Sequence, residues 1–134
     1  MIDWDALTQA ALDARALAYA PYSGYRVGAA LLGADGAVYT GANLENASYG
    51  LCLCAERVAM ARALMEGAQG FVAVVVATGG PTPAAPCGMC RQVLVEHAQG
   101  VPVRCVTADG DAVIDTDVSS LQPHAFDASF LDDD

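Results

Sequence analysis

The sequence predicts one α/β domain over residues 1–134, a three-layer sandwich in which helices cover both faces of a central five-stranded sheet. The expected order of elements is helix, two strands, helix, strand, helix and two strands, which suits such layers. The run FVAVVVAT at residues 71–78 has too little polarity to face water on either side, which predicts a fully buried strand. A chain of 134 residues that is 54% hydrophobic is also the right size for one domain.

The N-terminal half contains a helix, a hairpin and a second helix. A helix is expected over residues 3–20, ended by the proline of YAPYSGY, because apolar residues recur near helical spacing at Trp4, Leu7, Ala11, Ala14 and Ala18. Strands at residues 26–33 and 37–41 flank the turn sequence ADG. After the loop ANLENASYG, residues 54–67 predict a helix that Gly67 ends, since no other glycine or proline interrupts it.

The C-terminal half supplies the remaining elements. GGPTPAAPCG, at residues 79–88, is rich in glycine and proline and predicts a loop. MCRQVLVEHA, at residues 89–98, predicts a shorter helix, and strands at 101–107 and 111–115 flank a second ADG turn. The acidic residues 132–134 are expected to form a solvated tail.

Composition limits the partners and the compartment. Sixteen acids oppose six arginines, there is no lysine, and the formal net charge of −10 would repel a nucleic-acid polymer. No stretch approaches the roughly 20 apolar residues that cross a membrane, so we expect a soluble protein without membrane contact. The opening MIDWDALTQA has acids where a signal peptide has basic residues, and five cysteines is an odd number for disulfides. We therefore expect reduced cysteines in the cytoplasm.

Cysteines stand at the starts of two predicted helices. Cys54 opens one helix, while Cys87 and Cys90 open the other within PCGMC, a spacing that can wrap one metal ion. First-turn side chains lean toward the helix N-terminus, so both helices can reach an ion beyond their ends. Three thiolates favour zinc over magnesium or calcium, and three protein ligands leave a fourth position open to water. Glu56, close behind Cys54, is placed to move a proton from that water to a leaving group.

Three thiolates around a divalent ion give a net charge of −1, which acidifies bound water less than a three-histidine site does. Two helix N-termini, each equivalent to roughly +0.5 charge, would compensate in part. The neighbouring Arg57 and Arg91 offer a second source of compensation, because a guanidinium that donates to a thiolate draws charge off sulfur.

Other cysteines and the histidines have simpler interpretations. Cys52 is a candidate fourth ligand that would close the site and make it structural, but a closed site leaves Glu56 without a role. Cys105, inside VPVRCVT, is most economically a small buried apolar residue. His97 and His124 lack metal-ligand spacing with the cysteines, and we expect them at a helix end and in a turn.

The pattern CAE followed by PCGMC resembles the zinc-dependent nucleoside and nucleobase deaminases. Cysteine rather than histidine before AE points to the small cytidine deaminases within that superfamily. The resemblance covers nearly the whole chain, through the blocks YAPYSGYRVGAALL, GANLENASYGL, CAERVAMARALMEG, PCGMCRQVLVE and LQPHAF in the family's order. It implies the cytidine deaminase fold, whose sheet is mixed.

The resemblance also implies roles for individual residues. Cys54, Cys87 and Cys90 would hold one zinc ion per subunit, with Arg57 supporting them and Glu56 as the catalytic proton shuttle. The implied substrate-binding residues are Tyr25, Asn43, Glu45, Ala55 and Phe126.

Among these, Asn43 and Glu45 match positions that hydrogen-bond the sugar hydroxyls; without the resemblance they would be read as loop residues that cap their own backbone. Tyr25 stands where the family usually has phenylalanine beside the base, and Phe126 matches a residue that reaches the pyrimidine across a subunit boundary.

The implied activity is zinc-dependent hydrolytic deamination of free cytidine and deoxycytidine to uridine and deoxyuridine, with release of ammonia, in pyrimidine salvage. The implied assembly is a homotetramer with active sites near subunit interfaces. Two alternatives stay open: a deaminase for another aminopyrimidine nucleoside such as blasticidin S, and a zinc-stabilised structural or binding module. The second alternative requires four protein sulfur ligands and no open position.

Overall fold

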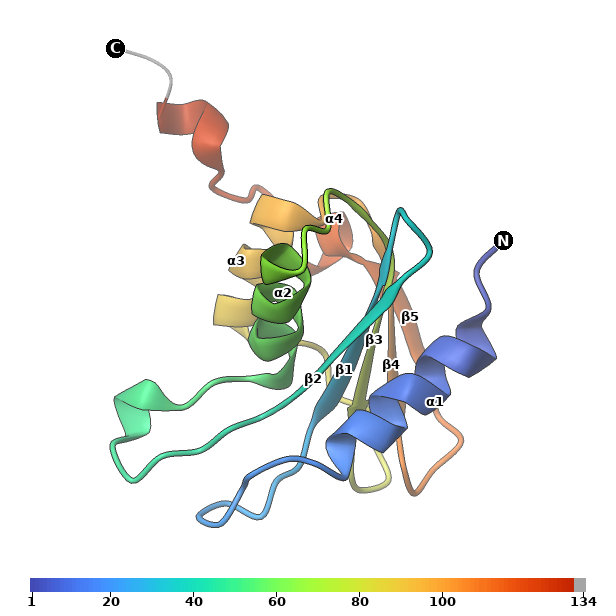
Figure 1. The fold of residues 1–134 in the computed structure, drawn as a ribbon, viewed down its shortest axis with the longest axis vertical. Coiled ribbons are helices and arrows are strands. Elements are labelled where there is room, and N and C mark those ends of the chain that lie inside the picture. Colours follow the sequence, from blue (N-terminus) through green and yellow to red (C-terminus); the bar gives the residue numbers. More distant parts are fainter. Residues whose placement is uncertain (132–134) are drawn as a thin grey trace.

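The computed structural model describes residues 1–131 and contains a five-stranded mixed sheet in the order β2-β1-β3-β4-β5 (Figure 1). The strands are β1 Gly28–Gly33, β2 Val38–Ala42, β3 Phe71–Thr78, β4 Pro102–Thr107 and β5 Ile114–Asp117. Only β3 and β4 pair in parallel, and the other three pairings are antiparallel. The predicted α/β fold with a mixed sheet is confirmed; the acidic tail at 132–134 lies outside the described residues.

Helices lie on both faces of this sheet. α1 (Trp4–Arg15) packs against one face, and α2 (Ala55–Met65) and α3 (Gly88–His97) lie on the other (Figure 1). Successive side chains of β3 point to opposite faces of the sheet, so both faces of this apolar strand need a helix layer to cover them. Val74 and Val76 pack in the cluster beneath α2 and α3, whereas Val75 packs in the cluster beneath α1. Only the start of β3 departs from the expected burial, with Val72 38% exposed.

Two glycines allow the helices to approach the sheet closely. A Cβ atom on Gly28 of β1 would lie 2.1 Å from the carbonyl oxygen of Ala11 in α1. On the opposite face, a Cβ on Gly41 of β2 would lie 2.4 Å from the amide nitrogen of Ala59 in α2. Both distances are below van der Waals contact with backbone atoms, so these positions exclude any side chain. The second contact fixes the depth at which α2 carries Glu56.

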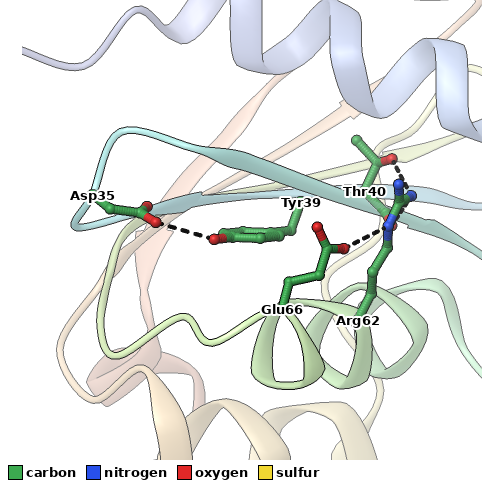
Figure 2. A network of polar contacts seen from close by, with 5 residues as sticks. All are labelled: Asp35, Tyr39, Thr40, Arg62 and Glu66. Carbon is green, nitrogen blue, oxygen red and sulfur yellow. Dashed lines mark hydrogen bonds and ion pairs between the residues drawn. The ribbon is translucent and has the colours of Figure 1, made fainter.

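Polar contacts hold α2 to β2 at the far end of the helix (Figure 2). Arg62 pairs with Glu66 one turn later at 3.1 Å, and its Nη1 lies 3.5 Å from both oxygens of Thr40 on β2. Nearby, the buried Tyr39 donates its hydroxyl to Asp35 in the β1–β2 turn at 3.1 Å. These contacts lie away from the cysteines, so they support the scaffold rather than the chemistry.

The first helix is shorter than predicted. It ends at Arg15 instead of continuing to residue 20: the amides of residues 16–18 each bond to the residue three positions earlier, and the chain then leaves the helix at Tyr19. The amide of Tyr19 donates to the carbonyl of Asn43 at 2.9 Å, and the carbonyl of Tyr19 accepts from Glu45 at 2.8 Å. This bridge ties the segment after α1 to the loop that carries Asn43 and Glu45.

The last strand begins later than predicted. The loop after β4 extends to residue 113, held by Asp109 accepting from the amide of Gly80 and by Thr107 accepting from Gly110. Three short elements were also not predicted: the 3₁₀ turns η1 (Tyr49–Leu51) and η2 (Ala128–Leu131), and α4 (Val118–Leu121). Among residues 1–131, no helix has the length and apolar character required to cross a membrane.

Candidate metal centre and adjoining cavity

The two helix starts bring three cysteines together. Cys54 is the N-cap of α2 and Cys87 the N-cap of α3, both with extended backbone, and Cys90 lies in the first turn of α3. The Cys54 thiol makes no capping hydrogen bond to α2. The sulfur atoms of Cys54 and Cys87 lie at the two helix ends, where they contact each other and can reach a shared ligand.

The sulfur positions fit a zinc ion. Cys54 Sγ lies 3.8 Å from Cys87 Sγ, and Cys87 Sγ lies 3.6 Å from Cys90 Sγ, with all three within 4.8 Å of one another. Sulfur ligands about 2.3 Å from a tetrahedral zinc ion are about 3.8 Å apart, so the Cys54–Cys87 and Cys87–Cys90 spacings match edges of a zinc tetrahedron. All five cysteines are free thiols.

The local electrostatics also favour a cation. Desolvation, followed by the nearby charges of Glu56 and Cys54, raises the pKa of Cys90. Desolvation acts in the same direction on Cys87, but hydrogen bonds from the backbone and side chain of Cys90 outweigh it and lower the pKa of Cys87. Three thiols and the carboxyl group of Glu56, of which Cys90 and Glu56 are buried, thus lie close together, and a bound divalent cation would stabilise their ionised forms.

Of the two arginines considered, Arg57 contacts a thiol. Its Nη2 donates to Cys54 Sγ at 3.7 Å and to the carbonyl oxygen of Cys52 at 3.3 Å. Arg91 instead donates to the carbonyl oxygens of Pro86 at 2.7 Å and Leu121 at 2.8 Å, which ties α3 to the C-terminal segment. Arg57 is therefore the guanidinium that can draw charge off sulfur.

Glu56 lies in the first turn of α2 and is only 5% exposed. Burial raises the pKa of its carboxyl group, against the opposing effects of its own backbone N–H and of Arg57. A carboxyl group with a raised pKa accepts and releases protons closer to neutral pH than an exposed glutamate does. Its environment therefore suits general acid–base work.

The metal centre opens into a cavity of about 510 Å³. This volume falls within the roughly 300–1,000 Å³ typical of small-molecule sites. The cavity contains most of the residues predicted from the sequence, namely Tyr25, Asn43, Glu45, Cys54, Ala55, Glu56, Arg57 and Cys87. The structure thus brings together residues from the loop after α1, the loop after β2, and the starts of α2 and α3.

Asn43 and Glu45 line the cavity and also organise the loop after α1. Asn43 Oδ1 accepts from the amide of Val27 at 2.8 Å, and its Nδ2 donates to the carbonyl of Tyr25 at 2.8 Å. Glu45 accepts from the backbone of Tyr22 and from Ser23. These side chains therefore bond the backbone of the loop after α1 and not their own backbone, and each still borders the cavity where a ligand would lie.

Two predicted residues lie apart from the three-cysteine group. Cys52 Sγ accepts from the amide of Asn46 at 3.3 Å and faces its carbonyl at 3.7 Å, so this thiol closes the loop instead of joining the metal ligands. Phe126 is 58% exposed, and the lining of the cavity in the described chain does not include it. Cys105 is fully buried, and the histidines occupy the predicted helix end and turn.

Several further residues line the cavity without having been singled out from the sequence, among them Tyr49, Thr78 and Met89. Thr78 had a sequence signal, because it is the polar residue that ends the otherwise apolar β3, and ligands of α/β sheets gather at carboxyl ends of strands. Tyr49 and Met89 had none, since an exposed aromatic and an exposed methionine resemble ordinary surface residues.

Known proteins are similar to this chain in both sequence and fold. The family model described as "Cytidine and deoxycytidylate deaminase zinc-binding region" matches residues 1–107. A curated relative named "Cytidine deaminase" from Halalkalibacterium halodurans is 45% identical over 133 residues, covering 98% of this chain and 100% of the relative. A second, from Sporosarcina psychrophila, is 42% identical over 93% of this chain and 92% of the relative.

Solved structures agree. The 1.6 Å crystal structure of cytidine deaminase from Burkholderia pseudomallei has a TM-score of 0.88 and 47% identity, with 94% of this chain and 100% of that chain covered. The cytidine deaminase from Mycobacterium tuberculosis has a TM-score of 0.82 and 39% identity, with 95% and 99% covered. From its family match, its full-length relatives and its three-cysteine zinc group, we conclude that the chain belongs to the cytidine and deoxycytidylate deaminase family.

Proposed function

We propose that this protein catalyses the hydrolytic deamination of free cytidine and deoxycytidine to uridine and deoxyuridine, with release of ammonia, in pyrimidine salvage. The observation that carries the proposal is the three-cysteine group, spaced for one zinc ion, beside the buried Glu56 in a cavity of small-molecule size. Cys54, Cys87 and Cys90 would hold the ion. When bound, zinc supplies a Lewis acid that lowers the pKa of a water molecule.

Glu56 carries the proton transfers. The carboxylate accepts a proton from water as the oxygen adds to C4 of the pyrimidine, and it delivers this proton to N3. Glu56 then takes the remaining hydroxyl proton and delivers it to the amino group, which leaves as ammonia while the C4 carbonyl forms. Cytidine and water are consumed, uridine and ammonia are produced, and Glu56 returns to its starting state. Its raised pKa suits a group that accepts and donates in turn.

The remaining lining supports recognition of a nucleoside. Asn43 and Glu45 offer an amide and a carboxylate for sugar hydroxyls, while Tyr25 offers an aromatic face and Ala55 a buried small surface beside Glu56. The net charge of −10 and the carboxylate of Glu45 disfavour phosphorylated ligands and nucleic-acid polymers. Free nucleosides are therefore the favoured substrates.

We further propose a homotetramer in which Phe126 contributes to a neighbouring subunit's site. Gln92 on α3 donates to the carbonyl of Phe126 at 2.7 Å, and the Phe126 ring stacks on Phe130 with centroids 5.5 Å apart. Phe126 is thus held in place, exposed, and outside its own chain's cavity lining. The free thiols suit a reducing compartment such as the cytoplasm.

Mixing two inactive variants tests this assembly. Glu56→Gln lacks the proton shuttle and Phe126→Ala lacks the ring, but a mixed assembly contains sites with both groups intact. We expect activity to reappear on mixing if Phe126 serves another subunit. If light scattering shows a tetramer but mixing restores no activity, Phe126 does not contribute to a neighbouring subunit's site. If light scattering shows a monomer, the proposed homotetramer is wrong.

The catalytic proposal is tested by Glu56→Gln, with exposed Glu96→Gln as the matched control. We expect Glu56→Gln to bind zinc as the original chain does but to lose about 10²- to 10⁴-fold in kcat on cytidine, the usual size of a general acid–base contribution. Glu96→Gln should retain full activity. If Glu56→Gln kept more than about a tenth of the rate, Glu56 would not be the proton shuttle.

A further inference from the structure

The carboxylate of Glu45 is held by a turn that precedes Tyr25 in the chain. Glu45 Oε1 accepts from the amide of Tyr22 at 2.9 Å and from the amide of Ser23 at 3.1 Å. Glu45 Oε2 accepts from the hydroxyl of Ser23. Three donors from two consecutive residues therefore converge on one side chain of the cavity.

The direction of the Ser23 hydrogen bond is fixed by its second contact. The amide of Tyr25 donates to Ser23 Oγ at 3.0 Å, so this oxygen is an acceptor toward Tyr25. The single hydroxyl proton of Ser23 is then directed to Glu45. Ser23 thus connects the backbone of Tyr25 with the carboxylate of Glu45.

Counting the acceptor sites of Glu45 shows what remains for a ligand. An ionised carboxylate has about four acceptor sites and no donor. The two amides occupy both sites on Oε1, and Ser23 occupies one on Oε2, which leaves one acceptor site on Oε2. Hydrogen bonds from Ser23 and Tyr22, led by that of the Ser23 side chain, lower the pKa of Glu45 and keep it ionised near neutral pH.

Ser23 itself does not line the main cavity. It lines a smaller neighbouring cavity of about 290 Å³ that shares Glu45 with the main cavity, whereas the main cavity's lining does not include Ser23 among the described residues. The hydrogen bonds of Ser23 to Glu45 and to the backbone of Tyr25 are therefore the contacts through which it can act on a ligand in the main cavity.

We propose that Ser23 is a positioning residue that presents Glu45 as an acceptor-only carboxylate, so that the enzyme selects a sugar hydroxyl able to donate a hydrogen bond. This inference rests on the proposed function, in which Glu45 contacts the sugar. It predicts that nucleosides with fluorine, a methoxy group or a phosphate in place of that hydroxyl are poor substrates. These groups only accept hydrogen bonds or, for phosphate, also add charge that the carboxylate repels.

The test uses the zinc-loaded enzyme with Ser23→Ala, Ser23→Thr, Glu45→Ala and the double variant Ser23→Ala/Glu45→Ala. Ser48→Ala is the matched control, because its exposed side chain makes no hydrogen bond to any other described residue. Each enzyme is assayed with cytidine, 2′-deoxycytidine and 3′-deoxycytidine. The substrate that Glu45→Ala weakens least identifies the hydroxyl that Glu45 accepts from.

We expect Ser23→Ala to raise KM for cytidine about tenfold with kcat within about twofold, because a hydrogen bond to a charged group is lost from binding and not from the chemical step. Ser23→Thr, which retains the hydroxyl, should restore most of the loss. The effect of Ser23→Ala should fall below about twofold with the substrate that lacks the hydroxyl and in the Glu45→Ala background.

An equal Ser23→Ala effect on all three substrates, or an undiminished effect in the Glu45→Ala background, would overturn the positioning role. If Ser23→Ala does not fold, Ser23→Thr decides, because its KM must stay within about threefold of the original under the proposal. If Glu45→Ala leaves KM unchanged, the sugar contact itself fails. If the original enzyme does not convert cytidine, the proposed function fails and this inference with it.

Discussion

Arg57 donates from Nη2 to the sulfur of Cys54 at 3.7 Å, three residues earlier on the same helix start. The same nitrogen also donates to the carbonyl of Cys52, so two hydrogen bonds hold the guanidinium beside the sulfur of Cys54. A positive charge at this position withdraws electron density from a thiolate and offsets part of the net −1 charge of a three-thiolate zinc centre.

Replacing Arg57 tests this compensation. We predict that Arg57→Gln lowers kcat on cytidine by about 10- to 100-fold, the usual range for a group that supports a metal ligand. Arg62→Gln, on the exposed side of the same helix, should leave kcat within about twofold. Kinetics and zinc content measured together check the prediction, and unchanged kcat in Arg57→Gln would show that the charge on sulfur needs no such partner.

A second prediction concerns the number of sulfur atoms that bind the zinc ion. X-ray absorption at the zinc edge should find three sulfur ligands at about 2.3 Å and one lighter ligand. Cys52→Ser should leave this spectrum unchanged, because the Cys52 thiol contacts the backbone of Asn46. Four sulfur ligands, reduced to three in Cys52→Ser, would instead indicate a closed structural site.

A third prediction concerns how far the close packing of α2 on β2 contributes to stability. Gly41→Ala should destabilise the fold by about 1–3 kcal/mol, because the new Cβ would meet backbone atoms of Ala55 and Ala59 that cannot rotate away. Gly70→Ala is the control, since a Cβ there has only an ordinary 3.6 Å contact with Ala34. Urea unfolding compares the two, and equal stabilities would mean that α2 shifts freely on β2.

Tyr39 provides a pH-dependent prediction. Desolvation, then the hydrogen bond to Asp35 and the charges of Asp35 and Glu66, raise the pKa of Tyr39 above 10.0 (Figure 2). The folded chain therefore holds this proton more tightly than the unfolded chain, so its stabilising contribution is complete below about pH 10 and declines as the pH rises through the folded-state pKa.

Tyr39→Phe isolates this effect because it removes the titrating hydroxyl. The free energy of unfolding of the original chain, minus that of Tyr39→Phe, should be constant at lower pH and should fall as the pH rises above about 10. Urea titrations of both proteins at several pH values measure the difference. A difference that stays constant as the pH rises above about 10 would show that Tyr39 has the same pKa in both states.

Local pattern predicts most of this fold and the gathering of Cys54, Cys87 and Cys90 into one group. β3 matches its predicted range because an apolar run of that length between glycines has few alternatives. The three-cysteine group follows from the spacing at two helix starts, where N-terminal geometry directs the thiols outward.

Local sequence patterns do not predict features that depend on contacts between distant segments. α1 ends early because Tyr19 pairs with Asn43 and Glu45, a contact between segments more than 20 residues apart that no local propensity encodes. Helix-start geometry alone left both Arg57 and Arg91 as partners for a thiolate, and only the family resemblance favoured Arg57, because the position of Arg91 depends on where the carbonyls of Pro86 and Leu121 lie. The role of Ser23 becomes visible only when Glu45 is placed beside its turn.

The most direct measurement is the ultraviolet absorbance of cytidine incubated with zinc-loaded, chelator-treated and zinc-restored protein. We predict conversion to the uridine spectrum with the loaded and restored samples, and none with the treated sample. An unchanged spectrum in a sample that holds one zinc ion per chain would contradict the proposed deamination, and equal conversion without zinc would contradict the role of the three cysteines.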